Sequence, residues 1–154
     1  PQSIAVTSEL MISESLTIEG PGARLLTLDG GGATRIISAL TTVDLEVSGL
    51  TFTGGDPGGF LRGGAISTSS GTLLTVVDCH FVSNTAYVAG ALYVLGSLDL
   101  RGSLFELNSS SGRPSALLVA NDAVVVNSTF SDNTGGDWQT LFENRAPVSL
   151  NHVT

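Results

Sequence analysis

Four stretches of this chain align without gaps: LEVSGLTF (Leu45 to Phe52), LTVVDCHF (Leu74 to Phe81), LDLRGSLF (Leu98 to Phe105) and AVVVNSTF (Ala123 to Phe130). A fifth, VSLNHVT (Val148 to Thr154), fits the same frame. The first residues of the five stretches are spaced by 29, 24, 25 and 25 residues. Such self-similarity at a nearly fixed period is typical of repeat architectures, in which each repeat is one structural unit that stacks on the next.

A second block lies between these stretches. It reads GGAI (Gly63 to Ile66), GALY (Gly90 to Tyr93), SALL (Ser115 to Leu118) and TLFE (Thr140 to Glu143). Turn residues separate it from the neighbouring stretches, so each repeat contains at least two short strands.

Apolar or small residues fill the first, third, sixth and eighth places of the aligned stretches. This is the period of two that a strand shows, followed by a bend. If the coils stack at the interstrand spacing of about 4.8 Å, equivalent residues form inward-facing columns. One column contains Leu45, Leu74, Leu98, Ala123 and Val148. A second contains Phe52, Phe81, Phe105 and Phe130.

The sequence therefore predicts an all-β fold, a right-handed single-stranded parallel β-helix of about six coils of roughly 25 residues. A propeller blade would need about 40 residues, and leucine-rich repeats would show LxxLxLxxN. We expect residues 1–154 to form a single segment of this solenoid. Because nothing after Val148 resembles a polar cap, we also expect the segment to be a fragment of a longer solenoid.

The alternation of GGAI (Gly63 to Ile66) with FxxN motifs such as Phe81 to Asn84 resembles the repeats of polymorphic outer membrane proteins. The opening SLTIEGPGARLLTLDGGGATR (Ser15 to Arg35) is similar to the first coils of secreted right-handed β-helix proteins of the pectate-lyase-like superfamily. The resemblance implies export and a long solenoid. It leaves activity open, since this superfamily includes lyases, hydrolases, adhesins and passengers without known catalysis.

The charge excludes several classes of partner. The net charge is −8, and the six basic residues are all arginine. Such a chain offers no footprint for a polyanion, so we expect no nucleic-acid partner. No apolar run of about 18 residues is present, so we expect no direct membrane insertion by this segment.

Asn84, Asn108 and Asn133 each follow a repeat phenylalanine by three places, where the chain turns out of the strand. We expect their amides to bond backbone groups of the next coil and to form a structural ladder with the phenylalanine column. The lone Cys79 occupies the inward sixth place and predicts a buried, inert thiol.

Carboxylates that would serve catalysis are scattered along the repeats. Glu46 and Asp99 share an outward column with Thr75 between them, so they lie roughly 9.6 Å apart at two coil rises. That separation is too wide for a nucleophile and acid pair, although it leaves an inverting arrangement open. Asp99 and Arg101 predict a surface ion pair. His80 and His152 occupy different repeat positions, and we expect no catalytic residue, metal or cofactor.

The first full repeat is four or five residues longer than its neighbours, and the excess lies in GGDPGGFLRGG (Gly54 to Gly64). Insertions in solenoids map to loops on one face, where binding often resides. Asp56, Phe60 and Arg62 are the residues that we expect to contact a sugar or peptide. The alternative is an idle insertion.

The predicted outer face carries Val77, Val124 and Val126. Exposed valines there indicate a lateral contact with another part of the parent protein. The leading functional hypothesis is a non-enzymatic structural and adhesive module of a secreted or cell-surface bacterial protein, with a surface glycan or a protein as ligand. One alternative is a fragment of a polysaccharide lyase or hydrolase. A second is a subunit of a filament or surface layer that associates end to end or laterally.

Overall fold

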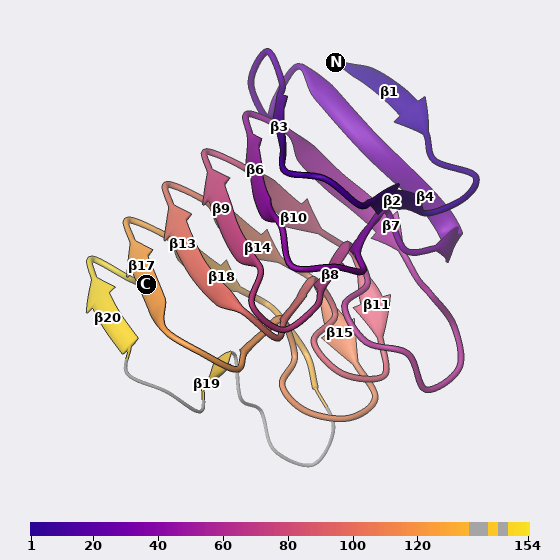
Figure 1. Cartoon of the computed structure of the whole chain (residues 1–154). Helices are drawn as coiled ribbons and strands as arrows, with labels where there is room; N and C mark the ends of the chain where they lie inside the picture. Colours follow the sequence, from indigo (N-terminus) through magenta and orange to yellow (C-terminus); the bar gives the residue numbers. More distant parts are fainter. Residues whose placement is uncertain (136–141, 145–147) are drawn as a thin grey trace.

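The structure is a computed structural model, and it describes residues 1–135, 142–144 and 148–154. Within these residues the chain forms strands and turns and no helix. No described segment is a helix long and apolar enough to cross a membrane. Three six-stranded parallel sheets and one two-stranded parallel sheet wind around a common axis (Figure 1).

The three large sheets each receive one strand per coil. The first sheet contains β1 (Gln2–Ala5), β4 (Leu26–Thr34), β7 (Thr51–Gly55), β10 (His80–Val82), β14 (Leu104–Glu106) and β18 (Thr129–Ser131). The second contains β2 (Leu10–Ile12), β5 (Ile37–Ala39), β8 (Ile66–Thr68), β12 (Leu92–Val94), β16 (Leu117–Val119) and β19 (Phe142–Asn144). The third contains β3 (Leu16–Glu19), β6 (Asp44–Ser48), β9 (Leu73–Val77), β13 (Ser97–Arg101), β17 (Ala123–Val126) and β20 (Val148–Asn151). The small sheet pairs β11 (Thr85–Ala86) with β15 (Ser109–Ser110).

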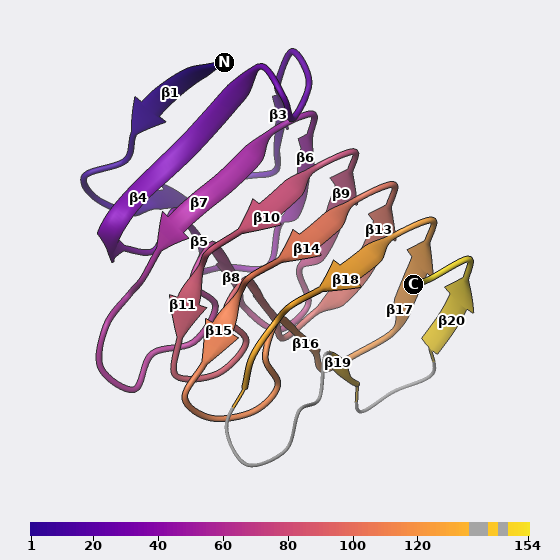
Figure 2. The ribbon, with the colours of Figure 1, turned by 180° about the vertical axis from the view of Figure 1, so that it is seen from behind.

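The winding is that of a right-handed parallel β-solenoid, as the sequence predicts. Six strands in each sheet correspond to about five full turns, against the expected six coils, and a turn takes roughly 25 residues. The termini lie at opposite ends of the axis (Figures 1 and 2). The register of the third sheet pairs Leu45 with Leu74, Leu74 with Leu98, and Leu98 with Ala123, which confirms the predicted alignment of the repeats. It also pairs Leu16 with Leu45, so the third sheet begins one rung before the first of the aligned stretches.

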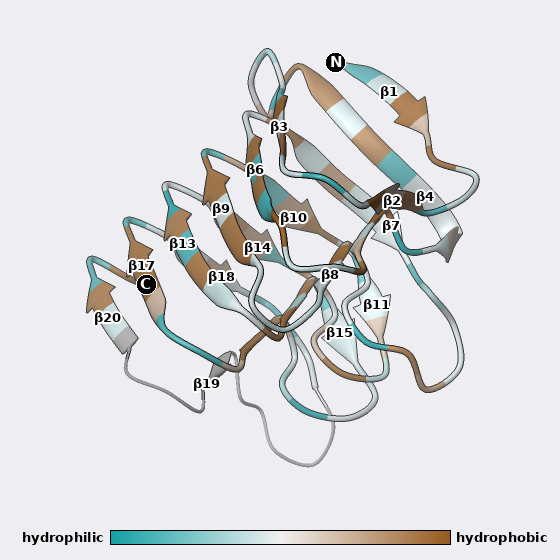
Figure 3. Ribbon diagram, in the orientation of Figure 1, coloured by the Kyte–Doolittle hydropathy of each residue, from teal (hydrophilic) through white to brown (hydrophobic). Residues whose placement is uncertain are grey.

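Alternation of side chains explains why these segments are strands. In β6, Leu45 and Val47 are buried and the flanking Asp44 and Glu46 are exposed. Figure 3 shows hydrophobic and hydrophilic residues alternating along β6 and β13, whereas β9 and β17 are hydrophobic over most of their length. Buried residues alternate with more exposed ones in β6, β9, β13 and β17, so the inward side chains of these successive coils form one continuous core.

The phenylalanine column is the central contact of that core. Neighbouring rings in the series Phe52, Phe81, Phe105 and Phe130 lie 4.9, 4.8 and 4.7 Å apart between centroids, with interplanar angles of 5°, 14° and 14°. Phe52, Phe81 and Phe105 are fully buried. The rings stack because the parallel register places each one directly over its counterpart, at about the spacing of the strands themselves.

The asparagine ladder lies beside this column. Asn84 Oδ1 accepts a bond from Gly55 N, and Asn84 Nδ2 donates to Phe52 O and to Asn108 Oδ1, each at 2.9–3.0 Å. Asn108 repeats the pattern with Phe81 O and with Oδ1 of Asn133, one rung further along. The amides therefore point into the solenoid and replace the backbone bonds that the chain loses where it turns.

Gly55 takes the asparagine position on the earlier rung and ends the ladder. A Cβ atom at Gly55 would lie 2.3 Å from Gly64 O and 2.9 Å from Asn84 Oδ1. The glycine is thus required by the close approach of the next segment rather than by a turn conformation.

The turn between the third and first sheets is also repeated. Its first residue adopts a positive φ in every coil of the predicted repeat, at Gly49, Asp78, Gly102, Asn127 and His152. The next residue points inward, and Cys79 N donates to Ser103 Oγ just as Ser103 N donates to Ser128 Oγ. Small polar side chains are therefore tolerated at this inward place because they satisfy turn amides.

The register confirms the alignment of the second block through its alanines. Ile66 pairs with Leu92 and Leu92 with Leu117, so Ala65, Ala91 and Ala116 occupy the same place in successive coils. The first copy, GGAI at Gly63–Ile66, therefore begins one place earlier in the repeat than GALY at Gly90–Tyr93.

Candidate functional site

Long connections emerge at one corner of the solenoid, between the first and second sheets; we call this region the loop corner. It comprises residues 56–65, 87–91 and 111–116 of three successive coils (Figures 1 and 2). The loops stack through backbone bonds: Tyr87 N donates to Leu61 O at 2.9 Å, and Gly112 N donates to Tyr87 O at 2.7 Å. The loops are therefore held in register with the rungs below them.

Arg35 anchors the first of these loops from beneath. Its guanidinium is almost buried, and it donates through Nε to Gly63 O at 3.0 Å and through Nη2 to Arg62 O at 2.9 Å. Nη1 faces both carboxylate oxygens of Glu9 at 3.1 Å. A buried guanidinium needs this full set of acceptors, and the carboxylate balances its charge, so the end of the loop is fixed to the two coils before it.

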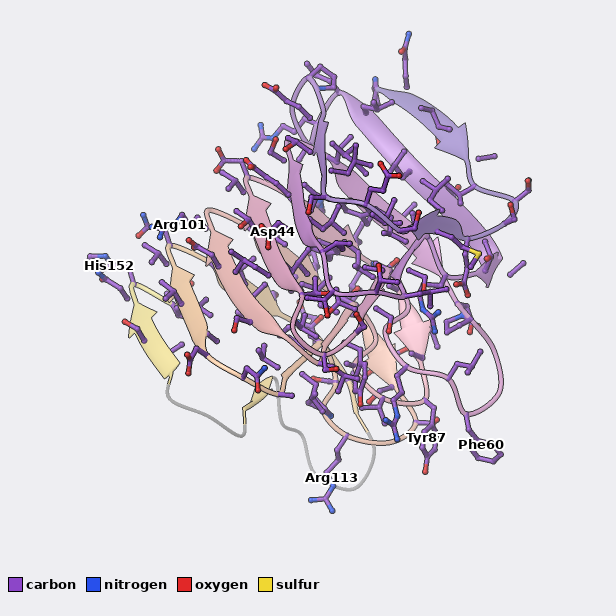
Figure 4. All side chains as sticks on the ribbon, in the orientation of Figure 1. Asp44, Phe60, Tyr87, Arg101, Arg113 and His152 are labelled. Carbon is purple, nitrogen blue, oxygen red and sulfur yellow. The ribbon has the colours of Figure 1, made fainter. Side chains whose placement is uncertain are left out.

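Aromatic side chains cover the outer part of the corner. The Phe60 side chain contacts the Tyr87 ring edge to face, with 5.1 Å between centroids and 84° between planes. Phe60 is 82% exposed, Leu61 51% and Tyr87 38%. Figure 4 shows Phe60, Tyr87 and Arg113 together on this side of the molecule. Large apolar side chains are thus presented to solvent on a loop that is otherwise well anchored.

Arg62 lies beside a second tyrosine. Its Nη1 atom donates to Tyr93 Oη at 2.6 Å, and its Cζ atom lies 5.1 Å from the centroid of the Tyr93 ring. Within the described part of the chain, the salt-bridge geometry gives the Arg62 guanidinium no carboxylate partner. Its charge is therefore held in place by a neutral ring and remains uncompensated there.

These residues border a shallow hollow of ≈ 370 Å³. It is lined by Arg35, Phe60, Leu61, Arg62, Ser67 and Tyr93. Aromatic faces, a cationic fork and a hydroxyl are suited to binding, since they combine apolar area with fixed donors. None of these six side chains is a carboxylate, a histidine or a cysteine.

Two of the three expected ligand residues, Phe60 and Arg62, line this hollow. Asp56 has a local structural contact instead: its Oδ1 atom accepts a bond from Gly58 N at 2.8 Å. That bond closes a turn of Asp56-Pro57-Gly58 and so shapes the base of the loop.

Of the described carboxylates, Glu46 and Asp99 share an outward column of the third sheet but do not lie on neighbouring rungs. The register places Thr75 between Glu46 and Asp99 on the outer face of the third sheet. Asp99 pairs with Arg101 through Nε at 2.8 Å and Nη2 at 3.0 Å, as the sequence predicts. Asp132 occupies a turn, where Ser131 Oγ donates to it at 2.8 Å. Among the residues that the structure describes, no three His, Cys, Asp or Glu side chains form a group suited to a metal ion.

The remaining candidates are structural. Cys79 is 2% exposed, and burial raises the pKa of its thiol to about 11, with the nearby Asp78 charge adding a smaller effect. At neutral pH the thiol is protonated and out of reach of solvent, which confirms the prediction of an inert cysteine. His80 Nε2 lies 3.4 Å from Glu106 Oε2 on the outer face of the first sheet, whereas His152 occupies a turn at the far end.

Val77, Val124 and Val126 lie on the outer face of the third sheet, as the sequence predicts. Arg101 pairs with Val77 on one side and Val126 on the other, so a charged side chain separates these two valines. Val124 is 37% exposed and pairs with Asp99 on the preceding rung. The three valines therefore do not form one continuous apolar patch, and a lateral contact through them stays a prediction.

The sequence did not indicate Glu9, Arg35, Tyr87 or Tyr93 as parts of the loop corner. Tyr87 and Tyr93 flank a repeat block, and their periodicity alone does not distinguish loop-facing from core-facing rings. A signal was available in Arg35, because an arginine beside a buried strand requires acceptors close by. The identity of those acceptors depends on the three-dimensional stacking of the coils.

Fold and corner together define a parallel β-solenoid with one loop-bearing edge. No protein-family model matches this chain, and neither a curated protein nor a solved structure matches it. The resemblance to pectate-lyase-like proteins and to polymorphic outer membrane protein repeats therefore has no support from a match, and it enters below only as a proposal.

Proposed function

We propose that this chain is a non-enzymatic structural and adhesive module, in which the solenoid acts as a rigid spacer and the loop corner contacts a ligand. The single observation that carries this proposal is Phe60, which is 82% exposed on a loop fixed by Arg35. An exposed aromatic on a held loop forms contacts with little further loss of conformational entropy. Tyr and Arg, as at Tyr87 and Arg62, are also enriched among the residues that dominate binding energy at interfaces, and Phe is enriched in interface cores.

The setting that we propose is the surface of a bacterium or its secreted fraction, with a surface glycan or a protein as ligand. The low content of charged residues, 13%, together with the resemblance to secreted β-helix and outer membrane repeats supports this setting. Membership in either of those two families belongs to the same proposal.

The rival is a fragment of a polysaccharide lyase or hydrolase. What weighs against it is the spacing of the described carboxylates, with Glu46 and Asp99 two rungs apart, at roughly 9.6 Å for a rise of about 4.8 Å. Incubation with acidic and neutral polysaccharides discriminates between the two. Turnover that is lost in Asp99→Asn or Asp132→Asn would replace the adhesive proposal with the enzymatic one.

The direct test measures retention of the purified chain on arrays of glycans and on layers of bacterial and host-cell surface protein. We expect Phe60→Ala and Arg62→Ala each to reduce retention on the surface that binds, by roughly tenfold or more for residues at the centre of a contact. Leu40→Ala is the matched control, because Leu40 is 58% exposed in the connection between β5 and β6, outside the loop corner. Equal retention of all variants would contradict a binding role for the corner.

A further inference from the structure

The third sheet carries a second hollow, of ≈ 350 Å³, on its outer face. Its lining comes from three neighbouring rungs and includes Asp44, Glu46, Leu73 and Thr75. Leu73 is 42% exposed, so an apolar surface lies next to two carboxylates. We call this feature the acidic hollow.

The loop corner has the opposite character. Phe60 and Leu61 project an apolar surface, and Arg62 adds a positive charge that no described carboxylate balances. The chain carries a net charge of −8, so this corner, with an arginine that has no carboxylate partner among the described residues, differs in charge from the rest of the molecule. The surface complementary to it is an apolar one edged by carboxylates.

We propose that the occupant of the acidic hollow is the Phe60–Arg62 segment of a second copy of this chain. This inference rests on the proposed function, and it names the partner of the loop corner. Phe60 and Leu61 pack against Leu73, and the Arg62 guanidinium pairs with the Asp44 and Glu46 carboxylates. Each part of the contact therefore meets a surface of complementary charge or polarity.

The two surfaces belong to separate parts of one molecule. In Figure 4, Asp44 lies on the third sheet, whereas Phe60 and Tyr87 lie at the loop corner. The anchoring of the loop by Arg35 keeps the segment at that corner, so the contact is made between molecules. A contact between two different patches is heterologous, and its repetition builds an open chain unless the rotation closes a ring.

Charge reversal at the two surfaces distinguishes a second copy of this chain from any other partner. Sedimentation equilibrium over a wide range of concentration should show self-association of the wild-type chain. Arg62→Glu and Glu46→Arg should each weaken it roughly a hundredfold, since like charges at a contact cost several kcal/mol. Arg24→Glu is the matched control: Arg24 is an exposed arginine in the turn between β3 and β4, and its reversal should leave association unchanged.

Mixing provides the decisive result. The Arg62→Glu chain keeps an intact acidic hollow, and the Glu46→Arg chain keeps an intact loop. An equimolar mixture should therefore associate at concentrations at which each variant alone stays monomeric. Circular dichroism and thermal unfolding of each variant verify the fold before mixing.

A strictly monomeric wild-type chain, association unaffected by either reversal, or a mixture that stays monomeric would each overturn the inference. If the wild-type chain is monomeric yet is retained on a glycan or on another protein in a Phe60-dependent way, only this choice of partner fails. If retention also does not depend on Phe60, the proposed adhesive function fails as well.

Discussion

The interior columns and the loop corner of this solenoid obey different constraints. Phe rings on neighbouring rungs contact one another, as do Asn amides on neighbouring rungs, so one residue type recurs at each of these places. At the loop corner the three coils carry different side chains, with Phe60, Tyr87 and Arg113 at stacked loops. Repetition therefore marks residues that hold the fold together, and its breakdown marks residues available for contacts.

The largest expected effect comes from the middle of the phenylalanine column. Phe105 is fully buried between Phe81 and Phe130. Phe105→Ala should lower the free energy of unfolding by about 3 to 5 kcal/mol, through lost transfer free energy and the cavity that remains. Urea denaturation measures the change, and Phe105→Leu, which fills part of the cavity, should lose less. Near-wild-type stability of Phe105→Ala would mean that the column does not carry the core.

The asparagine ladder gives the next largest effect. Asn108→Ala removes the acceptor of Asn84 N and Asn84 Nδ2, and it removes the side-chain donor to Phe81 O and one of the two donors to Asn133 Oδ1. Buried groups left without partners cost about 1 to 3 kcal/mol each, and neighbouring groups relax together, so we expect a loss of about 2 to 4 kcal/mol.

The control for this ladder is Asn121→Ala, at an exposed asparagine outside it, which should stay within about 0.5 kcal/mol of wild type. Hydrogen exchange at the Asn84 amide offers a local measurement, and it should accelerate in Asn108→Ala. Unchanged protection there would argue that the amide row is dispensable.

The sequence was sufficient for the columns because a parallel register preserves spacing. The repeat placed Leu45 over Leu74 and Phe52 over Phe81, and the strand pairing has these partners. It also placed Asn84, Asn108 and Asn133 where a turning backbone needs side-chain acceptors. Period and polarity alone carry this information.

The loop corner was only partly predictable, because its contacts join residues that no repeat spacing relates. The extra length at Gly54–Gly64 indicated a loop with Phe60 and Arg62 on it, and these residues line the hollow. The Arg35 anchor and the Tyr93 partner of Arg62 come from other coils, 27 and 31 residues away. No repeated spacing links these residues, so only the stacking of the coils brings them together.

The buried thiol of Cys79 belongs to the interior columns, and it should make the free energy of unfolding depend on pH. Burial raises the pKa of this thiol from 9.0 to about 11. The folded state therefore holds its proton more tightly than the unfolded state, and the resulting stability is present below pH 9 and is lost as the pH rises from 9 to 11. A shift of this size corresponds to roughly 2 to 3 kcal/mol.

The measurement compares wild type with Cys79→Ser, which places at this position the residue found at Ser103 and Ser128 on the following rungs. Urea denaturation at several pH values should show a steeper loss for wild type between pH 9 and 11 than for Cys79→Ser. Parallel curves would contradict a protonated, buried thiol.

The smallest expected effect on stability lies at the loop corner, and it tests the distinction between the two regions most directly. Phe60 and Phe105 are the same residue type, but Phe60 is 82% exposed, and it contacts the Tyr87 ring edge to face. Phe60→Ala removes little buried area and leaves the loop fixed through Arg35, whose bonds go to the backbone oxygens of Arg62 and Gly63. The free energy of unfolding should therefore change by less than about 0.5 kcal/mol, while retention on a ligand falls. A loss comparable to that of Phe105→Ala would place Phe60 in the framework of the fold, and its exposure would then say nothing about binding.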